Sequence, residues 1–80
     1  MATKRIQNHR QLIRSIGDNI TLHMQHQGLT WRETAERVEV STNTVGRWAR
    51  GESECGMLNL TRLCRLFKCR LHDLVPDAGS

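Results

Sequence analysis

The segment LTWRETAERVEVSTNTVGRWARG, residues 29–51, decides the fold. Thr30 is followed three residues later by Glu33, which is the spacing of a reciprocal capping box at a helix start. Ala35 and Val38 then recur at helical spacing on one face. The first half of the segment therefore predicts a short helix that begins after Thr30.

A second short helix is expected to follow after a tight turn. Ser41 is a good N-cap residue, and Gly51 is a good helix stop. Between them, residues 42–50 place Val45 and Trp48 on an inward face. Small polar residues and an arginine remain for the outward face. An ordinary helical hairpin would show the same periodicity, so the pattern is only moderately specific.

The rest of the chain predicts three further helices. A first helix is expected over about residues 8–27, on an apolar stripe formed by Ile13, Ile16, Ile20 and Met24. A fourth is expected from residue 56 or 57 to about residue 68, and a short fifth over residues 71–75. No segment has the alternation of a strand. The expected fold class is therefore all-α, a compact five-helix domain.

Length and charge limit the possible architectures. The 80 residues divide into a basic N-terminal arm (1–7), one domain (8–76) and a short tail (77–80). Twelve basic residues against eight acidic residues give a net charge of +4, and ten of the twelve are arginine. Arginine suits bidentate contacts to phosphate and guanine. A mildly basic solvated surface is the alternative, and net charge alone does not separate the two.

A metal site is the weaker alternative: His23 and His26 lie three residues apart, and His72 follows Cys69 by three. No residues indicate a cofactor or catalysis. Three cysteines (Cys55, Cys64 and Cys69) lack paired spacing, and no signal peptide or membrane-length apolar run is present, so a reduced, cytoplasmic protein is expected. A structural zinc site needs four ligands at recognised spacing, so the cysteines are expected to be small apolar residues and His23 to pack against the core. No nucleophile motif or glycine-rich phosphate loop points to an enzyme.

The helix pair at residues 29–51 resembles the lambda-repressor-like (Cro/CI, or XRE-type) helix-turn-helix family, and the resemblance extends over about residues 16–75. The first matching positions are Ile20, Gly28, Leu29, Thr30, Ala35, Val40, Ser41, Val45, Trp48 and Gly51. Those that follow are Met57, Leu60, Leu63, Cys64, Phe67, Leu71 and Leu74. Together they form a specific signal.

The chain also departs from the family pattern. Met24 and Ala49 replace a common arginine–glutamate pair, so packing is expected in place of a buried ion pair. Glu39 stands at the turn glycine, where a positive φ costs a non-glycine residue roughly 1 kcal/mol or more. Thr34 replaces a usual leucine, and Trp31 stands where a glutamine commonly contacts DNA.

The resemblance implies that the second helix of the motif enters the major groove of DNA. The family's base-contact positions fall on Thr42, Asn43 and Arg47. Arg47 could bind guanine in a bidentate way, Asn43 could bind adenine, and Thr42 could hydrogen-bond a base or contact a thymine methyl group. Gly46 is interpreted as a bare outward position that lets the helix approach the duplex closely.

Other groups are expected to hold the phosphate backbone. The phosphate-contact residues are expected to be Thr30, Trp31, Ser41, Thr44 and Arg50. A partly buried hydrophobic role is the alternative for Trp31. The basic arm could follow a groove or the backbone, or it could be disordered.

The resemblance also implies a homodimer on a palindromic site. The candidate dimer interface consists of Leu58, Leu66, Leu74 and Val75. The leading function is a sequence-specific double-stranded DNA-binding transcriptional regulator, a repressor of the phage or mobile-element type. Because the chain leaves no room for a sensing domain, its own concentration or a protein partner is expected to regulate it.

Two alternative functions belong to other classes of protein. One is an antitoxin-like protein-interaction module that neutralises a toxin partner and represses its own operon. A neighbouring toxin gene would favour it. The other is an architectural DNA binder without sequence preference, which fits the charge but not the short polar recognition helix.

Overall fold

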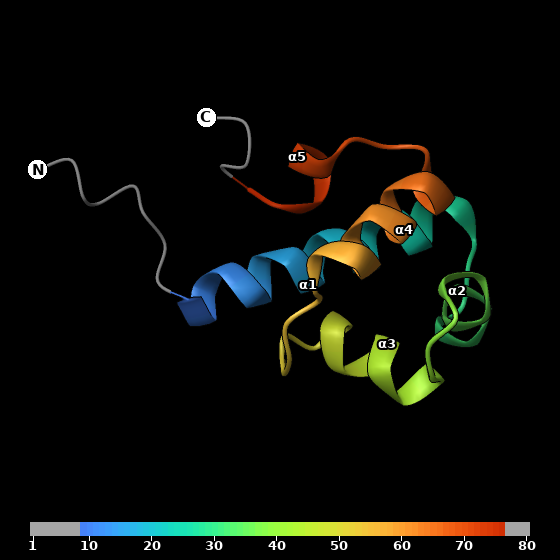
Figure 1. The fold of residues 1–80 in the computed structure, drawn as a ribbon, viewed down its shortest axis with the longest axis horizontal. Coiled ribbons are helices and arrows are strands. Elements are labelled where there is room, and N and C mark those ends of the chain that lie inside the picture. Colours follow the sequence, from blue (N-terminus) through green and yellow to red (C-terminus); the bar gives the residue numbers. More distant parts are fainter. Residues whose placement is uncertain (1–8, 77–80) are drawn as a thin grey trace, which may run out of the picture.

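Five helices account for most of residues 9–76, the part of the chain that the computed structural model describes (Figure 1). They are α1 (His9–Gln27), α2 (Trp31–Val38), α3 (Thr42–Ala49), α4 (Met57–Phe67) and α5 (Leu71–Leu74). No strand occurs among these residues, which confirms the all-α prediction, and the starts and ends of α3, α4 and α5 lie within one residue of their expected positions. The basic arm and the short tail lie outside the described residues.

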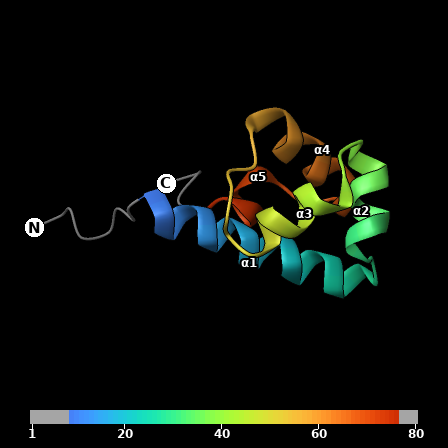
Figure 2. The ribbon, with the colours of Figure 1, turned by 90° about the horizontal axis from the view of Figure 1, so that it is seen from below.

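The long helix α1 is the element around which the others pack. It contacts α3, α4 and α5, and α2 packs against α3 and α4. Figure 1 shows α4 overlying the middle and the carboxyl end of α1, α3 below α1, and α2 at one end. Seen from below in Figure 2, α3 lies toward the viewer, so one of its faces is left open to solvent.

The core is built from the apolar faces that the sequence predicts. Its fully or almost fully buried apolar side chains are Ile20, Met24, Ala35, Val38, Val45, Trp48, Cys55, Leu60, Leu63, Phe67 and Leu74. They come from α1 to α5 and from the loop before α4, so a single cluster joins all five helices. Met24 is one of them, as expected for packing in place of an ion pair, and Ala49 is half-buried against the same cluster.

Side-chain amides of α1 anchor the carboxyl ends of two later helices. Asn19 Nδ2 donates to the Leu74 carbonyl at 2.9 Å, and Gln27 Nε2 donates to the Phe67 carbonyl at 2.8 Å. The last carbonyls of a helix have no partner within it, so these bonds satisfy groups that would otherwise need water. They fix α4 and α5 against α1.

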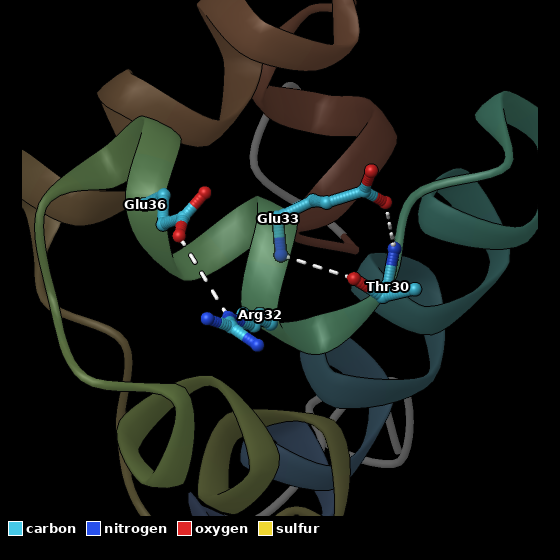
Figure 3. A network of polar contacts seen from close by, with 4 residues as sticks. All are labelled: Thr30, Arg32, Glu33 and Glu36. Carbon is cyan, nitrogen blue, oxygen red and sulfur yellow. Dashed lines mark hydrogen bonds and ion pairs between the residues drawn. The ribbon is translucent and has the colours of Figure 1, made fainter.

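The start of α2 forms the predicted capping box (Figure 3). The Glu33 amide donates to the Thr30 hydroxyl at 3.0 Å, and the Thr30 amide donates to the Glu33 carboxylate at 2.9 Å. The hydrogen bond from the Thr30 amide is the main cause that lowers the pKa of Glu33. Nearby on α2, the exposed Arg32 and Glu36 form an ion pair with an N–O distance of 3.8 Å.

Glu39 adopts the left-handed conformation in the turn between α2 and α3, with φ 59° and ψ 47°. The Val40 amide reaches back across it to the Ala35 carbonyl at 3.0 Å, as in a Schellman helix end. This geometry favours glycine, because an L side chain in the left-handed region meets the following carbonyl.

We therefore expect Glu39→Gly to stabilise the domain by up to about 1 kcal/mol, since relief of strain exceeds the entropy that glycine adds to the unfolded chain. The matched control is Glu36→Gly, in the middle of α2, which should lose about 1 kcal/mol. Urea unfolding of both variants measures the difference. Equal destabilisation by the two substitutions would show that the turn carries no strain.

Thr34 is a polar residue inside the core. Its side chain is fully buried, and its hydroxyl oxygen has no hydrogen-bond partner among the described residues. Burial without a partner costs a hydroxyl group about 1–3 kcal/mol. Valine has nearly the same shape and a similar helix propensity.

We expect Thr34→Val to raise the free energy of unfolding by about 1 kcal/mol, which corresponds to an increase of roughly 4–8 °C in Tm for a domain of this size. Thermal unfolding followed by circular dichroism measures the change. Thr61→Val, at an exposed position of α4, is the control and should change Tm little. A lower Tm for Thr34→Val would mean that the hydroxyl group has a partner in solution.

The histidine and cysteine side chains take structural positions. His23 stacks on Phe67 with ring centroids 5.4 Å apart, which agrees with the expected packing role. Cys55 is buried, and burial raises the pKa of its thiol to about 12. Cys64 and Cys69 are half-buried. Within residues 9–76, no cluster of three or more His, Cys, Asp or Glu residues could hold a metal ion. None of the helices described is both long and apolar enough to cross a membrane.

Candidate nucleic-acid interface

Helix α3 presents a polar face to solvent. Thr42, Asn43 and Arg47 are exposed on it, as the sequence predicts. Val45 and Trp48 point the other way and are 0% and 3% exposed. Two large buried anchors therefore fix the rotation of α3, and the same rotation sets three hydrogen-bonding side chains on its open face.

The start of α3 is held by a pair of hydroxyl groups. Ser41 accepts a hydrogen bond from the Thr44 amide at 3.1 Å, which confirms it as the N-cap. The Ser41 and Thr44 hydroxyls are also 2.8 Å apart and share a hydrogen bond. The first turn of a helix carries unpaired amides and the positive end of its dipole, which together favour a bound anion.

Trp31 covers Gly46, and the structure corrects the interpretation of this glycine. Gly46 is buried, and a Cβ atom at this position would lie 2.9 Å from Cζ3 of Trp31. The glycine therefore lets the indole ring of Trp31 pack closely against α3; it does not leave a bare surface for a duplex. Trp31 is 40% exposed, so it combines packing with an accessible edge.

Arg50 is already engaged by two neighbours. Its guanidinium group lies 5.6 Å from the centroid of the Trp31 ring, within the range of a cation–π contact. Arg50 Nε and Nη2 also donate to the Glu52 carboxylate at 3.0 and 3.3 Å. This hydrogen bonding is the main cause that lowers the pKa of Glu52. A phosphate at Arg50 would have to compete with this carboxylate.

We expect Glu52→Gln to strengthen binding to duplex DNA by about twofold to fivefold, because it removes a negative charge beside Arg50 and frees the guanidinium group for phosphate. Fluorescence anisotropy at two salt concentrations measures the gain, which should shrink at high salt. Glu36→Gln, on the exposed side of α2, is the matched control for the charge change. An unchanged affinity with Glu52→Gln would place Arg50 away from the backbone.

Thr30 has less capacity for phosphate than the sequence suggests. Its amide donates to Glu33, and its hydroxyl oxygen accepts from the Glu33 amide. The hydroxyl proton is the donor that this residue retains. The capping box therefore leaves Thr30 one donor, its hydroxyl proton, for a phosphate at the start of α2.

The candidate dimer residues do not all lie on the surface. Leu58 is 65% exposed, and Leu66 and Val75 are half-buried. Leu74 is fully buried in the core, so its assignment to an interface is wrong. It faces inward because α5 folds back onto α1. Met57, beside Leu58, is also 65% exposed, although in the sequence it matched only the family pattern of the fourth helix.

Two residues important for this surface carried no motif signal. Gly17 of α1 lies against the end of α3, where a Cβ atom would be 2.2 Å from the Trp48 carbonyl oxygen. Glu52 lies in the loop after α3 and pairs with Arg50. A lone glycine in a helical stripe and an acidic loop residue are both common, so only the packed helices reveal their roles.

The chain is similar in sequence to a known protein family. The family model described as helix-turn-helix matches residues 23–74, which include α2, α3, α4 and α5. No curated protein sequence gives a significant match to the chain.

Solved structures share the fold. The clp gene regulator ClgR from Corynebacterium glutamicum is 25% identical, with a TM-score of 0.75, over 79% of this chain and 67% of that chain. The restriction-modification controller protein C.AhdI from Aeromonas hydrophila is 18% identical, with a TM-score of 0.73, over 78% and 94% of the two chains. The DNA-binding domain of BldD is 18% identical, with a TM-score of 0.75, over 86% and 100%. The two likenesses at 18% identity show the fold alone.

Proposed function

We propose that this chain represses transcription as a homodimer on a palindromic operator. The premise is its family: the chain belongs to the lambda-repressor-like (XRE-type) helix-turn-helix family of DNA-binding transcription regulators. The observation that carries the proposal is the geometry of α3. Three polar side chains are exposed on a helix whose rotation is fixed by two buried anchors, Val45 and Trp48. A helix held in this way can present the same side chains to every site it meets.

The three exposed side chains would read bases in the major groove. Arg47 matches the two acceptors of guanine with its forked donors, and Asn43 matches the acceptor and donor of adenine. Thr42, at the start of α3, could donate to a base or contact a thymine methyl group. Each good bidentate pair discriminates by about 1–3 kcal/mol against a wrong base.

The backbone contacts would come from the edges of this helix pair. The Ser41 and Thr44 hydroxyls and the first amides of α3 face the same end of the helix, which suits one phosphate group. Thr30 and Trp31 at the start of α2 would contribute a hydroxyl and an indole donor to a second phosphate. The Arg50 guanidinium group would also bind a phosphate once its hydrogen bonds to the Glu52 carboxylate are broken.

A protein titration with random-sequence duplex DNA, followed by the backbone amide signals in NMR spectra, tests this placement. The largest changes should fall at the start of α2 and along the exposed side of α3, and they should weaken as salt is raised. Changes centred on α5 and the C-terminal half of α4 would contradict the assignment of the surface.

A homodimer would double the number of bases read and explain a palindromic site, with half-site centres about 34 Å apart. The exposed apolar residues Met57 and Leu58, with Leu66 and Val75, supply the candidate interface. Repression needs only occupancy of a promoter, as in control circuits of the phage or mobile-element type. Light scattering should give twice the monomer mass at micromolar concentration. A constant monomer mass would rule out a preformed dimer.

A further inference from the structure

An open hollow of about 340 Å³ lies between the end of α2 and helix α4. Its lining residues are Arg37, Glu39, Arg62, Arg65 and Leu66. Three guanidinium groups against one carboxylate leave a net charge of +2 around an apolar side chain. We call it the arginine hollow. The hollow is open to solvent, and its volume is at the lower end of the range for ligand-binding sites. It therefore suits one or two side chains of a partner better than a small molecule that needs to be surrounded by protein.

Arg62 is the fixed member of the group. Its Nη1 donates to the Val38 carbonyl at 3.1 Å, so it satisfies the carboxyl end of α2 while the rest of the guanidinium group stays available. Arg37 and Arg65, the other two arginines of the lining, are exposed. Among residues 9–76, none of these three arginines forms an ion pair, whereas Arg32 and Arg50 do.

The hollow is separate from the surface assigned to DNA. No residue of α3 lines it. In Figure 1 the carboxyl end of α4 lies toward the upper edge of the helical part of the molecule, whereas α3 lies at its lower edge. The hollow is therefore a positively charged surface distinct from the polar face formed by Thr42, Asn43 and Arg47, and it could hold a different ligand.

We propose that the arginine hollow binds an acidic segment of a partner protein, in which paired carboxylates flank an apolar side chain. Carboxylates match the guanidinium forks in charge and geometry, and the apolar side chain would cover Leu66. A DNA backbone fits less well, since it offers no apolar side chain to cover Leu66. This binding site goes beyond the proposed DNA-binding function and does not depend on it.

The probe is a hexapeptide with blocked ends, four glutamates and two central leucines, added to the whole ¹⁵N-labelled chain. Amide signals should shift around residues 37–39 and 62–66. Arg37→Glu and Arg65→Glu, both at exposed positions, should each raise the Kd of the peptide by about fivefold or more. Arg10→Glu, at an exposed position of α1 outside the hollow, should change it by less than about twofold.

Two controls separate this site from the DNA surface. A peptide with glutamine at the four glutamate positions should bind at least about fivefold more weakly, and Arg65→Glu should leave the affinity for duplex DNA unchanged within about twofold. Any of three results would overturn the proposal. The peptide could bind with the same Kd after the Arg37→Glu and Arg65→Glu substitutions, it could fail to bind at millimolar concentration, or the glutamine peptide could bind equally well. A large loss of DNA affinity with Arg65→Glu, without peptide binding, would reassign the hollow to the DNA backbone.

Discussion

Replacing Arg47 by alanine should raise the Kd for a selected operator by about 5-fold to 150-fold, or 1–3 kcal/mol, while weak binding to random duplex changes little. Arg47 is exposed on α3, and among residues 9–76 it forms no ion pair that would compete with a base. The loss falls on specific binding because a bidentate contact with guanine exists only at the correct site. Anisotropy titrations with operator and scrambled duplexes measure both affinities.

Arg10→Ala removes the same charge from an exposed position of α1. It should weaken both duplexes equally and slightly, through the general electrostatic attraction. If Arg47→Ala instead weakened binding to the operator and to the scrambled duplex by the same factor, Arg47 would be a phosphate contact. The assignment of Arg47 as a base contact would then be wrong.

The largest effect on stability is expected for Gly17→Ala. A Cβ atom at this position would lie 2.2 Å from the Trp48 carbonyl oxygen and 3.1 Å from that of Ala49. Both are backbone atoms, so α1 and α3 would have to move apart. The clash should exceed the roughly 1 kcal/mol that alanine gains over glycine within a helix, and a net loss of about 2 kcal/mol or more is expected.

Urea unfolding of Gly17→Ala, with Gly56→Ala as the control, measures this loss. A Cβ atom at Gly56 meets nothing within 4 Å, so the control should change stability by less than about 1 kcal/mol. Because Gly17 seats α3 on α1, operator affinity should fall in the same variant. If Gly17→Ala had the same free energy of unfolding as the wild-type protein, α1 and α3 would have to pack less closely in solution.

Local signals made most of the fold predictable from the sequence. The capping box of Thr30 and Glu33, the Ser41 N-cap and the glycines at helix ends act over three or four residues, so they need no knowledge of the tertiary structure. Helical periodicity likewise identified Val45 and Trp48 as the buried face of α3. The three exposed residues of that helix followed from the same rotation.

The features that the sequence could not predict depend on which helices meet. Gly46 looks like an open position on an isolated helix, but Trp31 of α2 covers it in the folded domain. Leu74 looks like an exposed chain end until α5 folds back onto α1 and buries it. The pairing of Arg50 with Glu52 depends on the path of the loop after α3. Each of these is a tertiary contact without a local signal.

The central claim is that α3 reads a DNA sequence, and selection of binding sites from a random duplex pool at near-physiological salt tests it most directly. The account predicts enrichment of an inverted repeat with half-site centres about one helical turn apart. It also predicts that Arg47→Ala relaxes the selected sequence at one base pair in each half-site. No enrichment over the starting pool by the wild-type protein would contradict the claim that this helix reads sequence.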